Sequence, residues 1–478
     1  MHSKDTLSQG IRWAVLGKLL GQIISWSSTI LVIRLLSPAD YGIVALASAP
    51  IGLFSIICGL GLDEVIVRKK EIDDRYQRRA LGALVLFNGL FYVLILLLSH
   101  SYASYLDAQQ LQLLLPVLGL QLLIGCFSYI PSALLERQLQ IRAITQVEVT
   151  ALIVGGLCSL LLAYNGLGVW ALVISTLANQ LTRSIGLSLA ARPQLMPSFA
   201  IKPLLSDLGF AGNVLANKVV WYLNQTLDDL LIGKLLGQQQ LGYYSVGKNF
   251  ALLPLQKIAG IIHQISFPSI AHSETSDHSR DLILKGLSLI CFTTFAVFFG
   301  VAAVSEPLTA LLFGAKWLDV ASVLALLSLL MPVKTINNFI GTATSALGHP
   351  GVRLRSQLII LATTLTAVVL GYEQGLERAL QLLLGGHYLI LPLLLINYCR
   401  VLPVTLLEVT LIGGRHLLVS LTSFAFCMFV ASGASGPLWM TLLLNCFIFG
   451  SSYLILARIF CRQDLSRLFS LIRHRHID

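Results

Sequence analysis

The sequence predicts an all-α polytopic membrane protein with about fourteen transmembrane helices, and three observations support this fold class. Long apolar runs recur along the chain, and 56% of its 478 residues are hydrophobic. Only 12% are charged, against roughly 25% in a soluble domain, and the mean hydropathy is +0.79. The third observation is an internal repeat. It indicates two halves built on one plan, so that about fourteen spans divide into two sets of six with two further C-terminal helices.

The repeat is clearest in two twelve-residue segments, 31–42 and 231–242. Both read leucine, two residues, a base, Leu-Leu, four residues, an aromatic or apolar residue, and then glycine. When the alignment of these two segments is extended toward the N-terminus at the same spacing of 200 residues, Lys218 aligns with Lys18. One pair of lysines could align by chance, but a whole dodecapeptide does so much less easily. The chain is therefore expected to consist of two halves built on one plan.

Each expected span is close to the ~20 residues that cross a bilayer. The first half is expected to supply spans at 11–36, 41–62, 80–99, 112–135, 147–164 and 168–190. The second half is expected to supply spans at 207–236, 242–265, 282–304, 320–347, 357–371, 379–398, 416–432 and 438–460. The ten residues before the first span lead into it without a small-residue cleavage site, which predicts a retained span and no signal peptide.

The expected spans divide the chain into two lobes with a linker and a tail. We expect an N-terminal six-helix lobe at 1–191, a cytoplasmic linker at 192–203, a C-terminal six-helix lobe at 204–400, two additional transmembrane helices at 401–460 and a basic amphipathic cytoplasmic tail at 461–478. The tail places apolar side chains on one helical face with arginines around it, which is typical of a helix lying in the membrane interface. A solvated basic tail is the alternative.

Basic residues predict the orientation of the chain, because Lys and Arg near short loops are retained on the cytoplasmic side. With the N-terminus inside, the inner loops collect most of these residues, while the outer loops hold little beyond Lys316 and Arg378. An even number of spans then places both termini in the cytoplasm. The chain is thus expected to cross a membrane many times with both ends on its inner side.

Polar residues at helical spacing form stripes on three of the expected spans. The stripe on span 207–236 consists of Asn213, Asn217, Trp221, Asn224 and Asp228, with Lys218, Gln225 and Asp229 on the adjoining edge. The stripe on span 242–265 includes Lys248, Asn249 and Gln256, and the stripe on span 320–347 includes Lys334, Asn337 and Asn338. Together with Lys18, these residues are the candidate substrate-binding cavity.

Such stripes are expected to face protein or water, because Lys, Arg or Asp at a helix centre costs roughly 2.5–3.5 kcal/mol to insert. Their fixed charge is mostly positive, which suits a large, hydrated, anionic cargo such as a pyrophosphate or an acidic glycan. The alternative is interhelical hydrogen bonding that only holds the bundle together. Asp228 and Asp229 could pair with Lys218 or Lys248, or could couple transport to a proton or sodium gradient.

No residue pattern predicts catalysis, a cofactor or a metal site. The chain has no GxSxG, HExxH or Walker motif and no carboxylate cluster on a long loop. Its eight cysteines include no CxxC and have no histidine at ligand spacing, so small core residues are the preferred interpretation. We therefore expect no enzyme and no ATPase. Movement of cargo would be driven by a gradient, by consumption of the cargo or by a partner.

Segments 34–42 and 59–70, which read RLLSPADYG and GLGLDEVIVRKK, resemble the polysaccharide transporter family. These proteins are lipid-linked oligosaccharide flippases, including O-antigen-type and lipopolysaccharide biosynthesis proteins, of the multidrug/oligosaccharidyl-lipid/polysaccharide flippase superfamily. Segments 132–142 and 345–348 also look like the fourth and tenth spans of that family. The resemblance covers essentially the whole chain, but its motifs are loose and carry no site residue over.

The resemblance implies two pseudo-symmetric six-helix lobes around a central cavity plus two C-terminal helices, in the bacterial inner membrane. It also implies that an undecaprenyl-pyrophosphate-linked oligosaccharide crosses this membrane by alternating access, for assembly of O-antigen, capsule or exopolysaccharide. The expected partners are this isoprenoid-linked glycan, membrane lipids and other polysaccharide assembly proteins, with no nucleic acid. One alternative is a MATE-like drug or cation antiporter, which would favour a net acidic, more aromatic cavity. Another is a membrane-embedded polysaccharide polymerase or ligase, which would usually need a sizeable outer loop. Every outer loop expected here is short.

Overall fold

The computed structural model of the chain describes residues 21–22, 25–59, 62, 66, 72–193, 196–200, 205–271, 275–431 and 436–466. The side chains of 205–214, 216–217, 255–271 and 276 lie outside this description. Every regular element in the described part is helical, which confirms the all-α class. The predicted amphipathic tail helix falls largely on residues 467–478, outside the described part.

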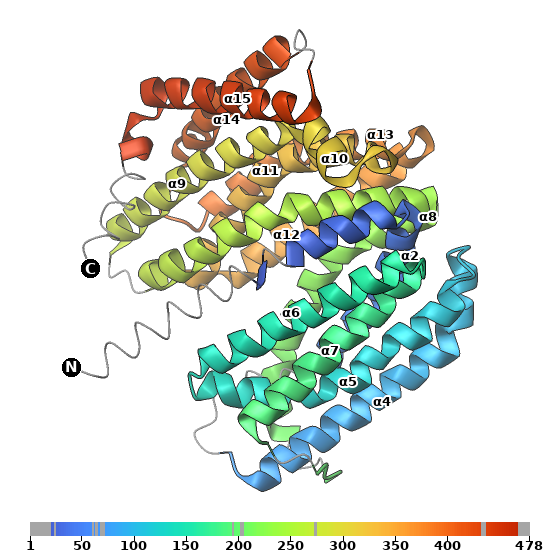
Figure 1. Ribbon diagram of the computed structural model, residues 1–478. Helices are drawn as coiled ribbons and strands as arrows, with labels where there is room; N and C mark the ends of the chain where they lie inside the picture. The colour runs from blue at the N-terminus through green and yellow to red at the C-terminus, as the bar shows by residue number, and fades with distance from the viewer. Residues whose placement is uncertain are drawn as a thin grey trace, which may run out of the picture. The chain divides into compact units, whose positions relative to one another are not determined.

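Thirteen labelled α-helices follow one another along the chain (Figure 1). They are α2 (Pro38–Cys58), α4 (Asp74–Tyr105), α5 (Leu111–Arg137), α6 (Ile141–Tyr164), α7 (Val169–Ala191), α8 (Leu205–Ala271), α9 (Ser276–Ala303), α10 (Ser305–Phe313), α11 (Val320–Ala346), α12 (Pro350–Gly371), α13 (Leu376–Cys399), α14 (Leu406–Ala431) and α15 (Leu438–Phe460). Residues 25–35 form a further helix before α2.

The chain is a multi-pass membrane protein. Ten helices in the described ranges are long and apolar enough to cross a membrane. The helix at 25–35, α7 and the two parts of α8 occupy the other predicted spans, so each of the fourteen predicted spans coincides with a helix in the described part of the chain. The short helix α10 is an addition that the hydropathy pattern did not predict.

Helix starts differ from the sequence prediction where a capping box extends a helix. Residues 37–40, which lie between the predicted spans 11–36 and 41–62, form the N-cap and the first turn of α2. There Ser37 is the N-cap, Pro38 follows it, and the Ser37 and Asp40 side chains each accept a hydrogen bond from the other residue's backbone N–H. Thr405 and Glu408 form the same reciprocal bonds, so α14 begins at residue 406 and not at the predicted 416. In both helices the N-terminal cap, and not the hydropathy of the residues that follow it, decides where the helix begins.

Helix α8 contains both the seventh and the eighth predicted spans. Its only interruption is Gly237, whose φ of 85° and ψ of 173° are not helical. A positive φ favours glycine, because an L side chain at that backbone conformation is strained. The two predicted spans thus follow one another almost without a loop.

The chain forms two compact units, Met1–Gly242 and Tyr243–Asp478. The N-terminal unit therefore includes the first part of α8 as well as α2 to α7. The finer division of the chain, with its linker at 192–203 and its extra spans at 401–460, stays a prediction. Within the N-terminal unit α5 packs on α4 and α7, and α6 packs on α7 (Figure 1).

The first part of α8 is joined to α2 by close contacts. The Tyr222 hydroxyl donates a hydrogen bond to the backbone oxygen of Ala49 at 2.9 Å. A Cβ added at Gly52 would meet the same hydroxyl at 2.2 Å, so only glycine leaves room for the tyrosine. Lys234 pairs with Asp107, the second residue after the end of α4, at 2.7 Å. These contacts position the polar stripe of α8 within the N-terminal unit.

Two repeat-related glycines make reciprocal backbone contacts. A Cβ added at Gly42 would lie 1.8 Å from the carbonyl oxygen of Gln238, and one added at Gly242 would lie 1.8 Å from that of Pro38. Residues 38 and 238 are 200 positions apart, as are 42 and 242, which is the register of the predicted repeat. The start of α2 and the chain after Gly237 thus cross in a pseudo-two-fold manner, with no space for a side chain at either glycine.

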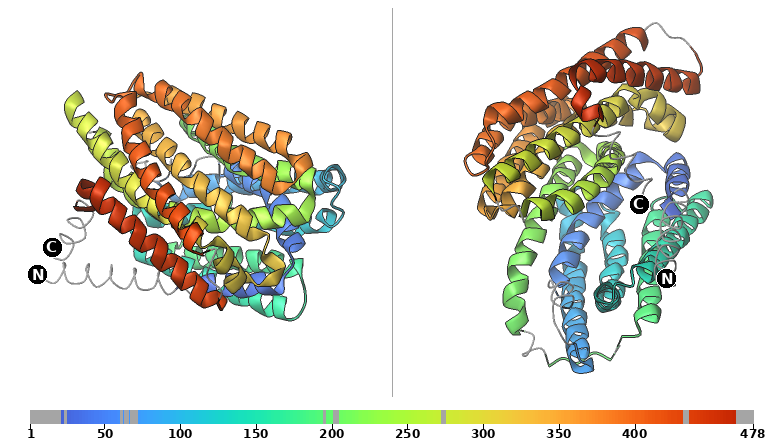
Figure 2. Two further views of the ribbon diagram at one scale, coloured as in Figure 1. Left: turned by 90° about the horizontal axis from the view of Figure 1, so that it is seen from above. Right: turned by 90° about the vertical axis from the view of Figure 1, so that its left-hand side faces the viewer.

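The C-terminal unit has an aromatic core. Helix α9 packs on α11 and α14, and α14 packs on α15 (Figure 2). Phe449 and Tyr453 of α15 are stacked with ring centroids 6.0 Å apart, and the Tyr453 hydroxyl donates to the backbone oxygen of Phe292 on α9 at 2.8 Å. The last two helices are therefore an integral part of the C-terminal unit.

Candidate functional site

The α8 stripe has mixed exposure in the structure. Asp228 is 4% exposed, while Trp221 is 61% exposed. Lys218, Asn224, Gln225 and Asp229 are half-buried. Asn213 and Asn217 have side chains outside the described part, and Lys18 lies outside it altogether.

Within this stripe, Asn224 carries an unused acceptor. Its Nδ2 donates to the backbone oxygen of Val220 at 3.0 Å, whereas its Oδ1 is buried and makes no hydrogen bond to any described atom. The Asp228 Oδ1 accepts the backbone N–H of Asp229 at 3.0 Å. The predicted pairing of either carboxylate with Lys218 or Lys248 stays a prediction.

The two other stripes belong to the C-terminal unit. Lys248 is 9% exposed, and its Nζ lies 5.3 Å from the ring centroid of Tyr244, a cation–π arrangement that offsets part of the cost of burying the charge. Asn249 is exposed and Lys334 is half-buried, while the Gln256 side chain lies outside the described part.

Asn337 and Asn338 hold neighbouring helices together. The Tyr398 hydroxyl of α13 donates to the Asn337 Oδ1 at 3.1 Å, and the Arg353 guanidinium of α12 donates to the Asn338 Oδ1 at 3.4 Å. These bonds are the interhelical contacts that the sequence left open as an alternative to cargo binding. Each bond occupies the Oδ1 atom of its asparagine side chain. Convergence of the three stripes on one cavity stays a prediction.

A polar pocket of about 270 Å³ lies inside the N-terminal unit, between α2, α4, α5 and α7. We call it the Arg183 pocket. Its polar lining includes Asn88, Gln121, Ser128, Tyr129, Gln180 and Arg183. Asn88 and Gln180 lie near the middle of their helices, and Arg183 lies eight residues, about 12 Å at 1.5 Å per residue, before the end of α7. The pocket is therefore at membrane depth.

Two buried atoms in the lining of this pocket have no hydrogen-bond partner in the described structure, the Nε of Arg183 and the Oδ1 of Asn88. Asn88 is 1% exposed, and its Nδ2 is already bonded to the backbone oxygen of Leu84 at 2.8 Å. An unsatisfied buried polar group costs about 1–3 kcal/mol, so a donor and an acceptor left open in one pocket indicate a space that another polar group enters.

A close helix approach shapes the pocket wall. A Cβ added at Gly125 of α5 would lie 3.0 Å from the Gln180 Nε2 of α7, tighter than an ordinary contact. The Ser184 hydroxyl of α7 donates to the backbone oxygen of Ile124 at 2.9 Å, which fixes the two helices at this distance. Glycine at 125 therefore lets the Gln180 amide lie against α5 and line the pocket.

A second pocket of the N-terminal unit is rich in hydroxyl groups and uncharged. It has a volume of about 320 Å³ and lies between the helix at 25–35, α2, α6 and α7. Ser28 and Thr29 donate to the backbone oxygen of Ser25, while Ser175 and Thr176 donate to that of Leu172. Because their protons are used within their own helices, these hydroxyls present mainly acceptor oxygens to the pocket.

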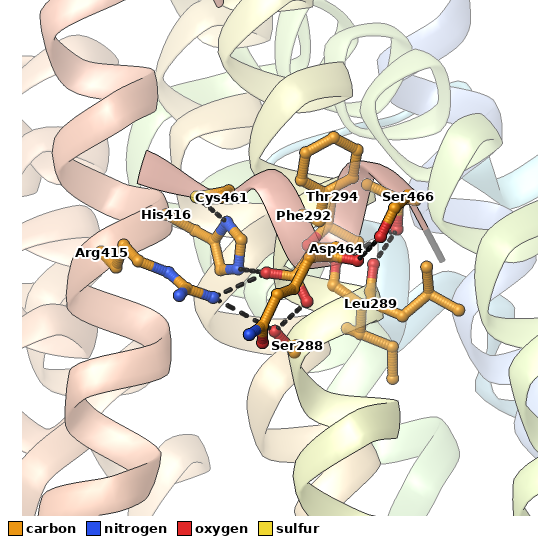
Figure 3. Close-up of polar contacts among 12 residues, drawn as sticks. Ser288, Leu289, Phe292, Thr294, Arg415, His416, Cys461, Asp464 and Ser466 are labelled. Carbon is orange, nitrogen blue, oxygen red and sulfur yellow. Dashed lines mark hydrogen bonds and ion pairs between the residues drawn. The ribbon is translucent and has the colours of Figure 1, made fainter. Parts of the chain in front are cut away.

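A buried polar cluster joins α9 and α14 to the segment after α15 in the C-terminal unit (Figure 3). Asp464, which is 2% exposed, accepts a hydrogen bond from Ser288 at 2.6 Å and pairs with Arg415 at 2.6 Å. His416 lies between Asp464 and Cys461, with its Nε2 3.5 Å from the carboxylate and its Nδ1 3.5 Å from the sulfur. Figure 3 shows these side chains pointing toward one another.

The electrostatics of this cluster favour an ionised carboxylate. Burial alone would raise the pKa of Asp464, but the adjacent His416, the hydrogen bond from Ser288 and the charge of Arg415 outweigh it, so its pKa is lowered. Burial raises the pKa of the Cys461 thiol. The fold thus brings a histidine to a cysteine, which the spacing of the sequence did not predict. Because Arg415 and Ser288 already bond the carboxylate, the arrangement is an internal ion pair that anchors the segment after α15.

Sequence reasoning missed Arg183 and the amides around it. Arg183 lies inside the predicted span 168–190, so the criterion that selected Lys218, an ionisable group at membrane depth, would also have selected it. Its neighbours Asn88 and Gln121 come from other helices, and no spacing in the sequence connects them. The cluster around Asp464 was missed for the same reason, since Ser288 and Asp464 are far apart in the chain.

The sequence matches the family described as polysaccharide biosynthesis protein over residues 31–322. This range covers more than half of the chain. The chain belongs to the polysaccharide biosynthesis protein family. The expected resemblance is thereby confirmed.

Named relatives support this family assignment. The lipopolysaccharide biosynthesis protein WzxC of Escherichia coli strain K12 is 22% identical over 378 residues, which cover 78% of this chain and 77% of the relative. The succinoglycan biosynthesis transport protein ExoT of Rhizobium meliloti strain 1021 is 24% identical over 379 residues, covering 77% and 75%. Both alignments cover about three quarters of this chain.

Solved structures show the same fold. The lipid II flippase MurJ, in an inward closed conformation, has a TM-score of 0.75 at 14% identity and covers 94% of this chain and 99% of its own. An inward-facing MATE multidrug resistance transporter of the MOP superfamily has a TM-score of 0.62 at 16% identity, covering 80% and 94%. The chain therefore has the fold shared by these transporters.

Proposed function

We propose that this protein is a flippase that moves an isoprenoid-pyrophosphate-linked oligosaccharide across the bacterial inner membrane. The observation that carries the proposal is the family match over residues 31–322, which spans the helices that hold the α8 stripe and the Arg183 pocket. Relatives whose names place them in lipopolysaccharide and succinoglycan biosynthesis support a role in surface polysaccharide assembly. The cargo would be an undecaprenyl-pyrophosphate-linked unit of O-antigen, capsule or exopolysaccharide.

The proposed topology has both termini in the cytoplasm. The excess of basic residues on the loops of one side supports it, because such residues are retained inside. Cargo would enter from the cytoplasmic leaflet and leave in the outer leaflet. Membrane lipids surround the transporter, and other polysaccharide assembly proteins would supply or receive the glycan.

In this proposal the basic side chains attract the pyrophosphate and the amides meet the glycan. The basic residues are Lys18, Lys218, Lys248 and Lys334. The amide residues are Asn213, Asn217, Asn224 and Gln225. The lipid tail stays in the bilayer, so only the polar head has to cross between the halves, which rock against each other in alternating access. Asp228 and Asp229 supply either ion pairs or the coupling-ion site.

The proposed activity is transport without a chemical step. A MATE-like drug or cation antiporter is the alternative that the shared fold leaves open, with a TM-score of 0.62 to such a transporter. A dye-efflux assay in cells separates the two, because a flippase for an anionic glycan carrier is expected to leave cationic dyes in the cell.

Charge reversal tests the cargo-binding role. Changing Lys218 and Lys248 together to Glu is expected to abolish glycan export in a strain that lacks the native gene, because two attractive charges become repulsive toward phosphate. The measurement is surface polysaccharide, together with the lipid-linked intermediate that accumulates on the inner leaflet. The variant Lys316→Glu, which reverses a charge at an exposed position, is the matched control and should support normal glycan export. Unchanged export by the double variant, at equal amounts of protein in the membrane, removes these lysines from the mechanism.

A further inference from the structure

The Arg183 pocket combines features that nothing in the proposed function requires. It places a guanidinium at membrane depth, leaves the Nε of Arg183 and the Oδ1 of Asn88 unbonded, and surrounds them with the amides of Gln121 and Gln180. We propose that this pocket binds an oxyanion, a carboxylate or phosphate group carried by the polar head of the transported molecule. This inference rests on the proposed function for the source of the anion.

The charge of the pocket favours an anion over a cation. Its charged lining residues are Arg183 and Glu136. Glu136 is exposed at the end of α5, where its carboxylate accepts a hydrogen bond from Ser132 at 3.3 Å. None of the ion pairs among the described residues joins it to Arg183. The interior of the pocket is therefore positive, and the negative group lies at its rim, so a metal ion or ammonium group inside would meet the guanidinium.

The donors suit an oxyanion with neighbouring hydroxyl groups. A guanidinium offers donors in a planar fork that matches carboxylate and phosphate oxygens. Each of Gln121 and Gln180 carries an amide that can donate to a further oxygen, and the open Asn88 Oδ1 can accept a hydroxyl proton. A carboxylated or phosphorylated sugar presents these groups together.

The volume sets the size of the occupant. Pockets for drug-sized ligands have volumes of about 300–1,000 Å³, and this one is about 270 Å³. It is large enough for one sugar or one diphosphate group and too small for a whole oligosaccharide. The pocket is thus a subsite that would distinguish acidic from neutral heads.

Binding is tested on the purified full-length protein in nanodiscs of phosphatidylcholine. Sodium glucuronate and inorganic diphosphate are the anionic probes, and glucose is the neutral one. A ligand that binds the native state raises the melting temperature, and a titration gives its affinity. We expect glucuronate, diphosphate or both to raise the melting temperature of the unchanged protein, and glucose to have no effect. Glucuronate alone would point to an acidic sugar, and diphosphate alone to the phosphates of the lipid carrier.

The Arg183→Gln variant is expected to weaken binding of the active probe at least tenfold. Its melting temperature without ligand should be kept or raised, because it removes a buried donor that has no partner. Arg183→Lys keeps the charge but loses the fork, so an intermediate affinity is expected. Arg142→Gln, at an exposed position of α6, is the matched control and should bind as the unchanged protein does.

Three results overturn the inference. These are equal shifts with glucose and the anions, unchanged affinity in Arg183→Gln, and no shift with any probe. Export in the deletion strain is scored separately from binding. A protein that restores export but binds neither anion leaves the proposed function standing and removes this inference, whereas loss of the proposed function would appear as failure of the unchanged protein to restore export.

Discussion

The reciprocal glycine crossing gives the sharpest prediction about stability. Replacing Gly42 by Ala puts a Cβ 1.8 Å from the carbonyl oxygen of Gln238, whereas ordinary contact begins at 3.4 Å. The two backbones must therefore separate by the difference, about 1.6 Å. Because the obstructing atom belongs to the backbone, no side-chain rotation relieves the overlap.

The expected magnitude follows from two opposing effects. Gly→Ala inside a helix stabilises it by about 0.8–1 kcal/mol through helix propensity. Overpacking costs about 1–3 kcal/mol and sometimes more, and a backbone overlap of this size belongs at the upper end. We expect Gly42→Ala to lower the free energy of unfolding by about 2 kcal/mol net. Gly242→Ala, which meets the Pro38 carbonyl oxygen at the same 1.8 Å, should behave alike.

Thermal unfolding in detergent micelles measures this effect, with Gly89→Ala as the matched control. Gly89 lies inside α4, and a Cβ added there meets nothing within 4 Å. The control is expected to melt at or above the temperature of the unchanged protein. The double variant Gly42→Ala, Gly242→Ala should be less destabilised than the sum of the two single variants, because one separation relieves both overlaps. If Gly42→Ala and Gly89→Ala melt together, the close crossing is refuted.

Three further predictions concern polar contacts. Asp464→Asn breaks the buried pair with Arg415 and should destabilise the protein by about 3 kcal/mol, the low end for such pairs because the Arg415 side chain is 39% exposed. The pKa of Asp464 is lowered in the folded state, so the stability that its carboxylate contributes is present above the ordinary Asp pKa of about 3.9 and is lost as the pH falls below that value. Asp464→Asn should lack this acid-dependent loss of stability. Acid unfolding curves of the same shape for the variant and the unchanged protein would contradict the assignment. Tyr222→Phe removes the bond to α2 and should cost about 0.5–1.5 kcal/mol in thermal melts, so a melt equal to that of the unchanged protein would rule the bond out. Asp107→Asn removes the exposed pair with Lys234 and should cost under about 1 kcal/mol, less at high salt; a larger or salt-independent loss would show that the pair is not screened.

Much of the fold is predictable because its determinants are local. Apolar runs of about 20 residues identify a helix at every expected position, since backbone polar groups in lipid have to be satisfied within the segment. The repeat register was also available from the sequence, and the contacts of Gly42 and Gly242 follow it. Helix starts were predicted less well. The capping boxes at Ser37 and Thr405 begin α2 at residue 38 and α14 at residue 406, before the predicted starts at 41 and 416.

The polar sites could be predicted only in part. The polar stripe from Lys218 to Asp229 can be recognised in the sequence because its residues share one helix and recur at helical spacing. The Arg183 pocket needs four helices to meet, and the Asp464 cluster needs α9 and α14 to meet the segment after α15. Asn337 was selected by the same periodicity as the α8 stripe, although its oxygen holds Tyr398 of α13. Periodicity shows which face of a helix is polar, but the partner of that face depends on tertiary packing.

The central claim is transport of a lipid-linked glycan head across the bilayer, and reconstitution tests it most directly. The purified protein is placed in liposomes with a fluorescent undecaprenyl-pyrophosphate oligosaccharide, and an impermeant quencher reports which leaflet holds the label. A flippase is expected to exchange the label between leaflets, and the Lys218→Glu, Lys248→Glu variant should fail to do so. Leaflet exchange no faster than in protein-free liposomes, measured with protein that is folded and inserted, would contradict the account.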